Sequence, residues 1–178
     1  MMIEVRTIEQ HDYERAHAFQ SEYLDREKFP EFVQRVAANP DLYFVAVNGD
    51  ELIGICYGHP SKKDESVITL QGIAVDLNET KGYARVGIGS RMIRVFESAV
   101  KTRGYRKIAV GSADDPTVEK FYLKNGFKPT ELVAKGLHYE EYERISIDDY
   151  EVGNVRREEL WRKYAPKEVI FIFEKSIG

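Results

Sequence analysis

The sequence predicts a mixed α/β fold in a single domain over residues 1–178. Short apolar segments with strand-like alternation are interspersed with segments whose apolar residues recur every three or four positions, as on one helix face. Asn48-Gly49-Asp50 lies between two apolar runs and predicts a hairpin, because Asn-Gly accepts positive φ. A chain of 178 residues that is 43% hydrophobic is also the right size for one packed core.

Local signals justify each element in chain order. A strand over residues 3–7 precedes a helix that begins near Asp12 and a second helix that begins at Pro30. The second helix ends before Asn39-Pro40, because the residue before a proline avoids the helical region. Asp115-Pro116 predicts the start of a later helix, and Asn125-Gly126 its end. The other expected strands are 43–47, 52–57, 67–75, 108–110, 131–134 and 169–173, and the other expected helices run to about residue 102 and follow residue 154.

Composition and charge exclude several classes of protein. The single cysteine, Cys56, lies in an apolar strand pattern, so no internal disulfide and no cysteine-based metal site is expected, and a reducing cytoplasm fits. The N-terminus alternates like a strand, and no run approaches about 18 apolar residues, so we expect neither secretion nor a membrane-bound protein. A net charge of −4 argues against a nucleic-acid partner, since such proteins usually present a basic face.

A run of small residues, Gly82 to Ser90, lies between a predicted strand and a predicted amphipathic helix. Small residues let the backbone approach a ligand closely, and the N–H groups of a first helical turn carry partial positive charge. The run therefore predicts a cradle for a phosphate group.

Two familiar phosphate loops fit this run poorly. Gly82 and Gly87 have the spacing of an ATP- or GTP-binding P-loop, but Ile88 and Gly89 stand where its lysine and hydroxyl residue belong. A dinucleotide-binding fingerprint would need a third glycine where Met92 stands. The part of the run that these comparisons leave is a Gly-x-Gly pattern before a helix in the middle of the chain.

This remainder resembles the acyl-CoA loop of the GNAT superfamily of N-acetyltransferases, Gln/Arg-x-x-Gly-x-Gly/Ala. Gly87 and Gly89 match the pattern, Ala84 stands where Gln or Arg is usual, and Arg85 lies one position late. A second segment some 30 residues downstream resembles the family's motif Asn-x-x-Ala-x-x-Phe-Tyr ending in Gly-Phe. There Phe121, Tyr122, Gly126 and Phe127 match, while Asp115 and Val118 replace Asn and Ala.

The resemblance covers roughly residues 3–134 and 168–176 and implies a mostly antiparallel central sheet of about seven strands, with helices on both faces. In the family the fourth and fifth strands splay apart, and the slot between them holds the pantetheine arm of acetyl-CoA. By position, the slot would use the backbone of Ile73, Ala74 and Val75, and Gly72 is compatible with a bulge that opens it. The diphosphate of the cofactor would lie on the loop made of Arg85, Val86, Gly87, Ile88, Gly89 and Ser90.

Two departures from the family stand out. Eleven residues, 76–86, separate the long strand from Gly87, about four more than expected. A segment at about 135–167 is inserted before the last strand, and its residues 139–151 carry six acids against one base, Arg144. This segment could attract a cationic acceptor, or it could be a solvated insertion whose aromatic residues cover the core or contact a second copy of the chain in a homodimer.

Acetyl transfer from a thioester to an amine needs a proton donor for the departing thiolate and a base for the amine. The resemblance makes Tyr122 the general acid, and a phenol, whose ordinary pKa is about 10, is protonated at neutral pH. The alternative is a core tyrosine. For the base, Asp76, Glu79, His59 and ordered water all remain open, and no metal is needed.

The expected function is therefore acetyl-CoA-dependent transfer to a small-molecule or peptide amine. A non-catalytic acyl-CoA-binding regulator of the same fold is the main alternative, and a nucleotide-binding or phosphotransfer domain is the other. The acceptor itself cannot be derived from the fold class.

Overall fold

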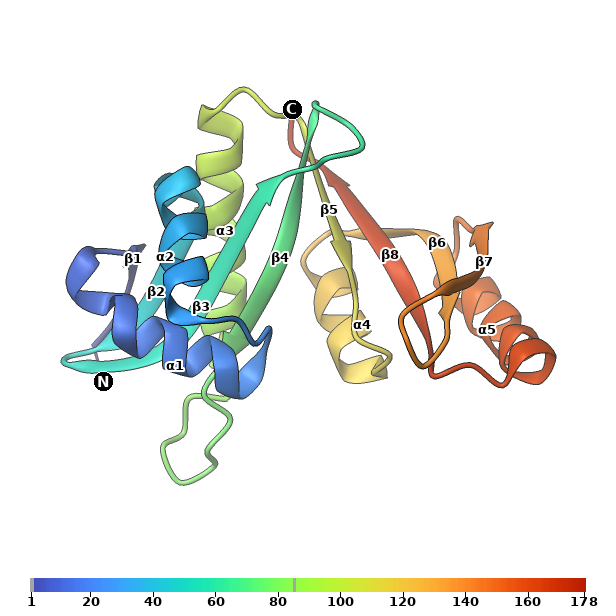
Figure 1. Ribbon diagram of the computed structural model, residues 1–178, viewed down its shortest axis with the longest axis horizontal. Helices are drawn as coiled ribbons and strands as arrows, with labels where there is room; N and C mark the ends of the chain where they lie inside the picture. Colours follow the sequence, from blue (N-terminus) through green and yellow to red (C-terminus); the bar gives the residue numbers. More distant parts are fainter. Residues whose placement is uncertain (1, 85) are drawn as a thin grey trace. The chain divides into compact units, whose positions relative to one another are not determined.

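The computed structural model describes residues 2–84 and 86–178. The chain folds into two compact units, the first comprising Met1–Arg106 with Ile177–Gly178 and the second Lys107–Ser176. Each unit contains four antiparallel strands with helices packed on them (Figure 1).

The sheet of the first unit has the strand order β1-β2-β3-β4. Its strands are β1 (Ile3–Thr7), β2 (Tyr43–Asn48), β3 (Glu51–Pro60) and β4 (Val67–Val75), and its helices are η1 (Gln10–Asp12), α1 (Tyr13–Tyr23), α2 (Phe29–Ala38), η2 (Pro40–Leu42) and α3 (Ile88–Thr102).

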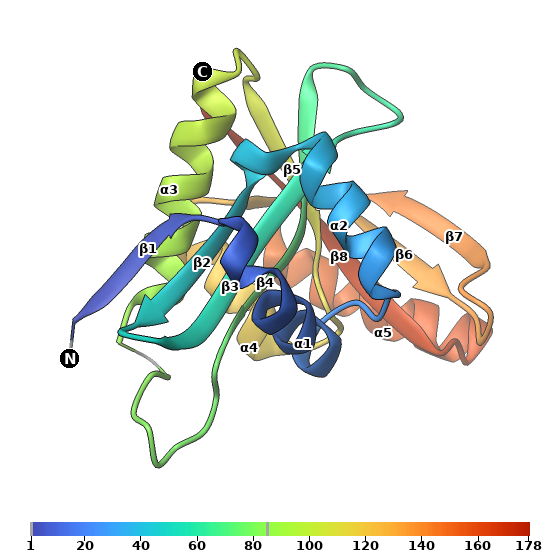
Figure 2. The same cartoon turned by 60° about the vertical axis from the view of Figure 1, so that its left-hand side comes forward.

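Different helices cover the two faces of this sheet (Figures 1 and 2). On β2, Tyr43, Val45 and Val47 join the core beneath α1 and α2, whereas Phe44 packs edge-on against Phe96 of α3. Successive strand residues point to opposite faces, so α1 and α2 lie on one face and α3 lies on the other. Both faces of β2 are therefore apolar, which explains why its sequence shows no polar alternation.

The sheet of the second unit has the strand order β5-β8-β6-β7. Its strands are β5 (Lys107–Gly111), β6 (Lys128–Lys135), β7 (Glu141–Ser146) and β8 (Glu168–Ser176), and its helices are α4 (Pro116–Lys124) and α5 (Tyr150–Tyr164). Asp115 caps α4 by accepting a hydrogen bond from the Thr117 N–H at 2.9 Å, as the Asp-Pro pair predicts.

The structure confirms the predicted fold class, a mixed α/β fold with a mostly antiparallel sheet, and the described residues form eight strands where about seven were expected. The additional strand is β7, which pairs with β6 inside the inserted segment. Its sequence, Glu-Tyr-Glu-Arg-Ile-Ser, exposes most side chains and so lacks the apolar alternation by which strands are predicted. The fourth and fifth strands belong to different units, so their predicted splay stays a prediction. The single domain also stays a prediction.

The helix expected after Asn154 begins earlier, at Tyr150. Asp149 is its N-cap and accepts a hydrogen bond from the Val152 N–H at 2.9 Å. The Tyr150 ring packs on Phe171 at 5.1 Å between centroids. Both contacts fix the first turn of α5. The prediction used only the spacing of apolar residues along the helix, which does not show these contacts.

Cys56 is fully buried in β3, and this burial raises the pKa of its thiol. Among the described residues, no helix is long and apolar enough to cross a membrane.

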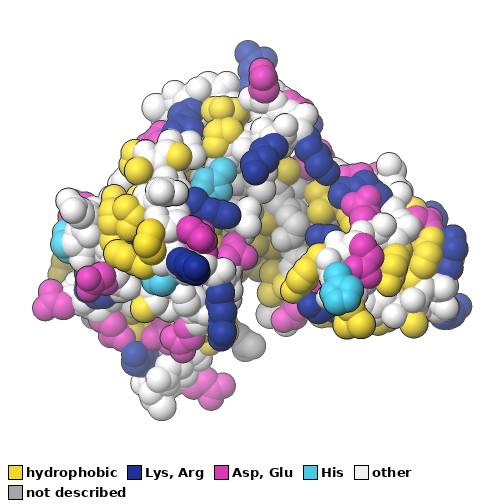
Figure 3. All heavy atoms as spheres, viewed as in Figure 1, with side chains coloured by type: hydrophobic (Ala, Val, Ile, Leu, Met, Phe, Trp, Pro, Cys, Tyr) yellow, Lys and Arg dark blue, Asp and Glu magenta, His cyan; other side chains and the backbone are white. Residues whose placement is uncertain are grey.

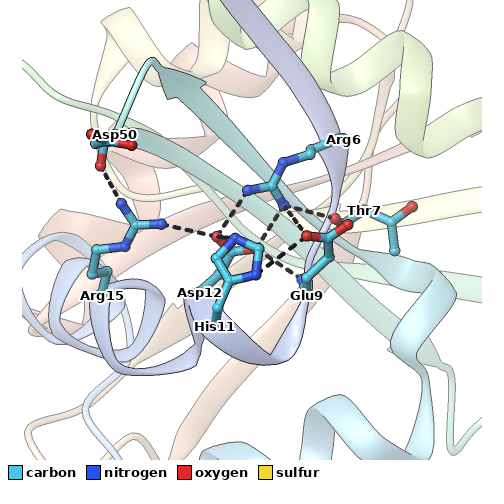
Figure 4. Close-up of polar contacts among 7 residues, drawn as sticks. All are labelled: Arg6, Thr7, Glu9, His11, Asp12, Arg15 and Asp50. Atoms are coloured by element: carbon cyan, nitrogen blue, oxygen red, sulfur yellow. Dashed lines mark hydrogen bonds and ion pairs between the residues drawn. The ribbon is translucent and has the colours of Figure 1, made fainter.

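Asp12 is fully buried and is the centre of a charged network that joins β1 to α1 (Figure 4). Arg6 donates to both carboxylate oxygens, from Nη1 to Oδ2 at 2.6 Å and from Nη2 to Oδ1 at 2.9 Å. Arg15 donates to Oδ1 at 3.1 Å, and the Glu9 N–H donates to Oδ2 at 2.8 Å. The Asp12 carboxylate thus accepts a backbone N–H at the start of η1 and also pairs with two cations.

Asp12 also belongs to a group of three side chains that could in principle bind a metal ion. Ligand atoms of Glu9, His11 and Asp12 lie within 4.8 Å of one another. However, Arg6 and Arg15 already place positive charge against Asp12, and Glu9 and Asp12 form the capping box of η1, so we interpret the group as a helix cap with His11 beside it. Burial raises the pKa of Asp12, but the Arg6 hydrogen bonds and the Glu9 N–H outweigh burial and hold it at about 2, below its ordinary value of 3.8.

We expect Asp12→Asn to lower the free energy of unfolding by about 2 kcal/mol at neutral pH, which corresponds to the depressed pKa of Asp12. A depressed pKa stabilises the fold above the ordinary pKa. The difference between variant and wild type should therefore shrink as the pH falls from about 4 to about 2. Urea unfolding followed by circular dichroism across this pH range measures it. Glu14→Gln, at an exposed acid in the first turn of α1, is the control, and a difference that does not vary with pH would contradict the assignment.

Candidate functional site

The N-terminus of α3 lacks a side-chain cap. Its N-cap residue is Gly87, with φ 86° and ψ 10°, and within the described part of the chain this helix start has no side-chain cap hydrogen bond. Arg91 is the first residue whose N–H bonds back into the helix, to the Gly87 carbonyl at 3.0 Å. The N–H groups of Ile88, Gly89 and Ser90 therefore have no intrahelical acceptor. None of the first-turn side chains is acidic, so this helix end is suited to an anion.

The long segment between β4 and α3 is fastened to the β2–β3 hairpin. Lys81 Nζ lies 2.6 Å from Glu51 Oε1 and 3.3 Å from Asp76 Oδ2. The buried Tyr83 donates its hydroxyl to Glu51 Oε2 at 3.0 Å and accepts from Asn48 Nδ2 at 2.8 Å. These contacts hold Lys81 and Tyr83 against the hairpin. Arg85, which the sequence places in the cradle, lies outside the described residues, and Val86 is exposed.

The backbone groups of β4 alternate in direction. The Asp76 N–H donates to the Ile53 carbonyl at 2.8 Å, and the register pairs Ala74 with Ile55. Because bonded and non-bonded pairs alternate in an antiparallel ladder, the backbone groups of Ala74 also face β3. The N–H and C=O groups of Ile73 and Val75 point away from β3. Of the three residues predicted to line a slot, these two carry the outward groups.

A bulge in β4 lies next to Gly72, as predicted. Tyr57 and Gly58 on β3 pair with Gly72 and Leu70, so Gln71 is the additional residue. A Cβ atom at Gly72 would lie 2.8 Å from the Tyr57 ring. Only glycine leaves room for the Tyr57 ring to lie this close to the backbone of β4.

An acidic side chain that no sequence motif marks lies beside this bulge in the structure. Asp25 follows α1 and is exposed, and its Oδ2 accepts hydrogen bonds from the Tyr57 hydroxyl at 3.0 Å and from Gln71 Nε2 at 3.2 Å. We call Asp25, Tyr57 and Gln71 the Asp25 cluster. No motif marks Asp25, since its partners lie 32 and 46 residues away in sequence.

The three predicted base residues lie in different surroundings. Asp76 is buried, and the Asn78 N–H and Lys81 lower its pKa. His59 contacts the Tyr43 hydroxyl through Nε2 at 3.1 Å, and burial lowers its pKa, which favours the neutral ring. Glu79 is exposed in the segment after β4. Asp76 holds the start of that segment through Asn78 and Lys81, and its lowered pKa makes it a weaker proton acceptor than an ordinary aspartate.

Tyr122, the predicted general acid, belongs to the second unit. It is buried on α4, where its ring packs against Phe127 and Phe173 with centroids 5.7 Å apart in both cases. Its carbonyl accepts the N–H groups of Asn125 and Phe127 at 3.1 Å and 3.0 Å, at the end of the helix. This setting fixes the ring closely, and the catalytic role stays a prediction.

Local cations pair with two of the six acids of residues 139–151, Glu141 and Glu143. Glu143 contacts Lys163 Nζ at 3.0 Å and the Tyr164 hydroxyl at 2.6 Å. Glu141 pairs with Arg144 at 2.7 Å, and Asp149 caps α5 by accepting a backbone N–H. Figure 3 likewise shows basic and acidic side chains interspersed over one face of the protein. The attraction of this segment for a cationic acceptor is therefore weaker than its sequence suggests.

Comparison with known proteins gives the family. The sequence model of the Acetyltransferase (GNAT) family matches residues 2–127. The chain therefore belongs to the GNAT family of acetyltransferases. No match to the chain was found among curated protein sequences.

Solved structures share the fold at low sequence identity. An N-acetyltransferase from Staphylococcus aureus Mu50 has a TM-score of 0.71 at 15% identity, with 100% of both chains covered. Arabidopsis thaliana Naa50, in complex with the bisubstrate analogue CoA-Ac-MVNAL, has a TM-score of 0.67 at 15% identity, with 99% of this chain and 99% of that chain covered. Diaminobutyrate acetyltransferase EctA from Paenibacillus lautus, in complex with L-2,4-diaminobutyric acid and coenzyme A, has a TM-score of 0.67 at 15% identity, covering 97% and 94%.

We expect Gly87→Ala to lower the free energy of unfolding by about 1 kcal/mol, because a Cβ atom disfavours positive φ. Among the described residues other than its chain neighbours, none has an atom within 4 Å of the added Cβ, so the expected cost is conformational and not a clash. The matched control is Gly89→Ala, two residues on within the helix, where alanine should be neutral or stabilising by up to about 1 kcal/mol. Thermal unfolding of both variants measures the difference, and equal effects would contradict a left-handed Gly87.

Proposed function

We propose that the protein is an acetyl-CoA-dependent N-acetyltransferase. The observation that carries this proposal is the left-handed Gly87, which leaves the first-turn N–H groups of α3 uncapped in a chain of the GNAT family. Bound acetyl-CoA would supply an activated acetyl thioester. The residues of this chain would hold it, accept the amine and deliver a proton.

The N–H groups of Ile88, Gly89 and Ser90 would donate to the diphosphate of the cofactor, and the helix dipole would add to the attraction. Arg85 and Val86 directly precede this turn and are proposed as further contacts. The absence of a Cβ atom at Gly87 keeps the approach to these groups open. Nothing in this arrangement calls for a metal ion.

On β4, the outward N–H and C=O groups of Ile73 and Val75 would pair with the amide groups of the pantetheine arm, as an added strand does. Ala74 would take part only through its neighbours, since its own backbone groups face β3. An N–H group in this position can also donate to the thioester oxygen as that oxygen gains negative charge.

The Asp25 cluster is proposed to receive the acceptor amine. Within the described residues, both hydrogen bonds to the Asp25 carboxylate end on Oδ2, so Oδ1 is the oxygen proposed to accept from an ammonium group. An exposed carboxylate attracts the protonated amine and can take its proton before attack. Asp25 is thus proposed as the group that takes this proton, beside the earlier candidates Asp76, Glu79, His59 and ordered water.

Tyr122 is proposed as the acid that protonates the departing thiolate. The nitrogen forms a bond to the acetyl carbon, the carbon–sulfur bond breaks, and the sulfur takes the phenolic proton. The acceptor would be a small-molecule or peptide amine, in line with the diamino acid and the peptide analogue bound by the two structural relatives. A cytoplasmic location and a homodimer also stay predictions.

For Tyr122→Phe we expect kcat to fall about 10- to 1000-fold while the affinity for coenzyme A changes little, as for the loss of a proton donor. Free thiol release with a panel of amines gives kcat, and calorimetry with coenzyme A gives the affinity. Tyr142→Phe, at an exposed tyrosine of the same unit, is the control. Equal turnover in both variants would remove Tyr122 from the mechanism. Binding of coenzyme A without turnover of any amine would favour the regulatory alternative, and no binding would refute the proposal.

Asp25→Asn keeps the shape of the side chain but removes its charge and most of its basicity. We expect kcat/KM for the amine to fall about 10- to 100-fold, with KM for acetyl-CoA unchanged. Glu22→Gln, at an exposed acid three residues earlier, is the matched control. If steady-state kinetics gave the same kcat/KM for wild type and Asp25→Asn, Asp25 would not be part of the acceptor site.

A further inference from the structure

A buried ion network joins the inserted segment to helix α4. Arg157 of α5 donates from Nη1 to Glu119 Oε2 at 2.8 Å and from Nη2 to Glu119 Oε1 at 2.6 Å. Its Nη1 also donates to Asp114 Oδ1 at 2.8 Å. Glu119 is fully buried and accepts the Tyr150 hydroxyl at 2.7 Å. A glutamate on α4 is thus held by two side chains of α5.

This network leads to Tyr122 in two ways. Glu119 lies three residues before Tyr122 on α4, so both side chains lie on one side of the helix. The Arg157 guanidinium also lies 4.7 Å from the centre of the Phe171 ring. Phe171 stacks with Phe173 at 5.6 Å, and Phe173 packs on the Tyr122 ring at 5.7 Å.

The energetics favour a geometric role for these charges. A buried ion pair adds little net stability over apolar side chains, but each charge left alone is costly, so the pair holds its partners in one arrangement. Helix α4 has nine residues and is too short to be stable alone, so tertiary contacts must set its direction. Arg157 also lies beyond residues 2–127, the part of the chain that matches the family.

We propose that Arg157 is a positioning residue, which holds α4 and thereby places the Tyr122 hydroxyl for proton transfer. This inference rests on the proposed function of Tyr122. In this proposal the inserted segment fixes the direction of the short helix α4 within the second unit.

The test combines Arg157→Lys, which keeps the charge but loses the two parallel hydrogen bonds, with the milder Tyr150→Phe. Carbon-13 labelling of the tyrosine ring lets the Tyr122 signal be followed by NMR and identified by its loss in Tyr122→Phe. We expect Arg157→Lys to move this signal and to lower kcat about 10- to 100-fold, with KM for acetyl-CoA changed less than about twofold. Tyr150→Phe should produce a smaller change in the same direction.

Arg162→Lys, at an arginine of α5 whose side chain is 77% exposed, is the control and should move neither quantity. An unmoved Tyr122 signal in folded Arg157→Lys would overturn the proposal, as would a fall in kcat that matches only a loss of folded protein. If Arg157→Lys does not fold, Tyr150→Phe decides by the same criteria. If the wild type acetylates no amine, the proposed function fails, while the Tyr122 signal still decides whether Arg157 positions it.

Discussion

The contact between Tyr57 and Gly72 is the constraint on which the arrangement of the first unit's site depends. The ring lies so close to β4 that a Cβ atom at Gly72 would be 2.8 Å from it. This contact places the Tyr57 hydroxyl against Asp25 and lies beside the bulge at Gln71. Beyond the bulge, the register directs the backbone of Ile73 and Val75 away from β3. Gly72 thus lies where the Tyr57 ring, its contact with Asp25 and the bulge of β4 come together.

Local chemistry made much of this architecture predictable. Asn48-Gly49, Asp115-Pro116 and Asn125-Gly126 act within a few residues of themselves, and each lies at an element boundary in the structure. Gly87 is likewise left-handed at the start of α3, where the glycine pattern places the cradle. Signals of this kind need no knowledge of which strands are neighbours.

The parts that were missed depend on contacts between distant residues. Asp25 becomes noteworthy only because Tyr57 and Gln71, 32 and 46 residues away, donate to it. The different roles of Ala74 and its two neighbours follow from strand register, since a shift of one residue would reverse them. Strand β7 is held by pairing with β6 and by ion pairs such as Arg144 with Glu131 at 2.9 Å, neither of which appears as an apolar pattern.

The buried Cys56 has a practical consequence for spectroscopy. A thiol that is fully buried and has a raised pKa reacts slowly with maleimides. A second cysteine at an exposed position, such as Leu77→Cys, where the native side chain is 64% exposed, would therefore take a spin label or dye selectively. The native cysteine could stay in place, and pairs of such labels would report distances between the two units in solution.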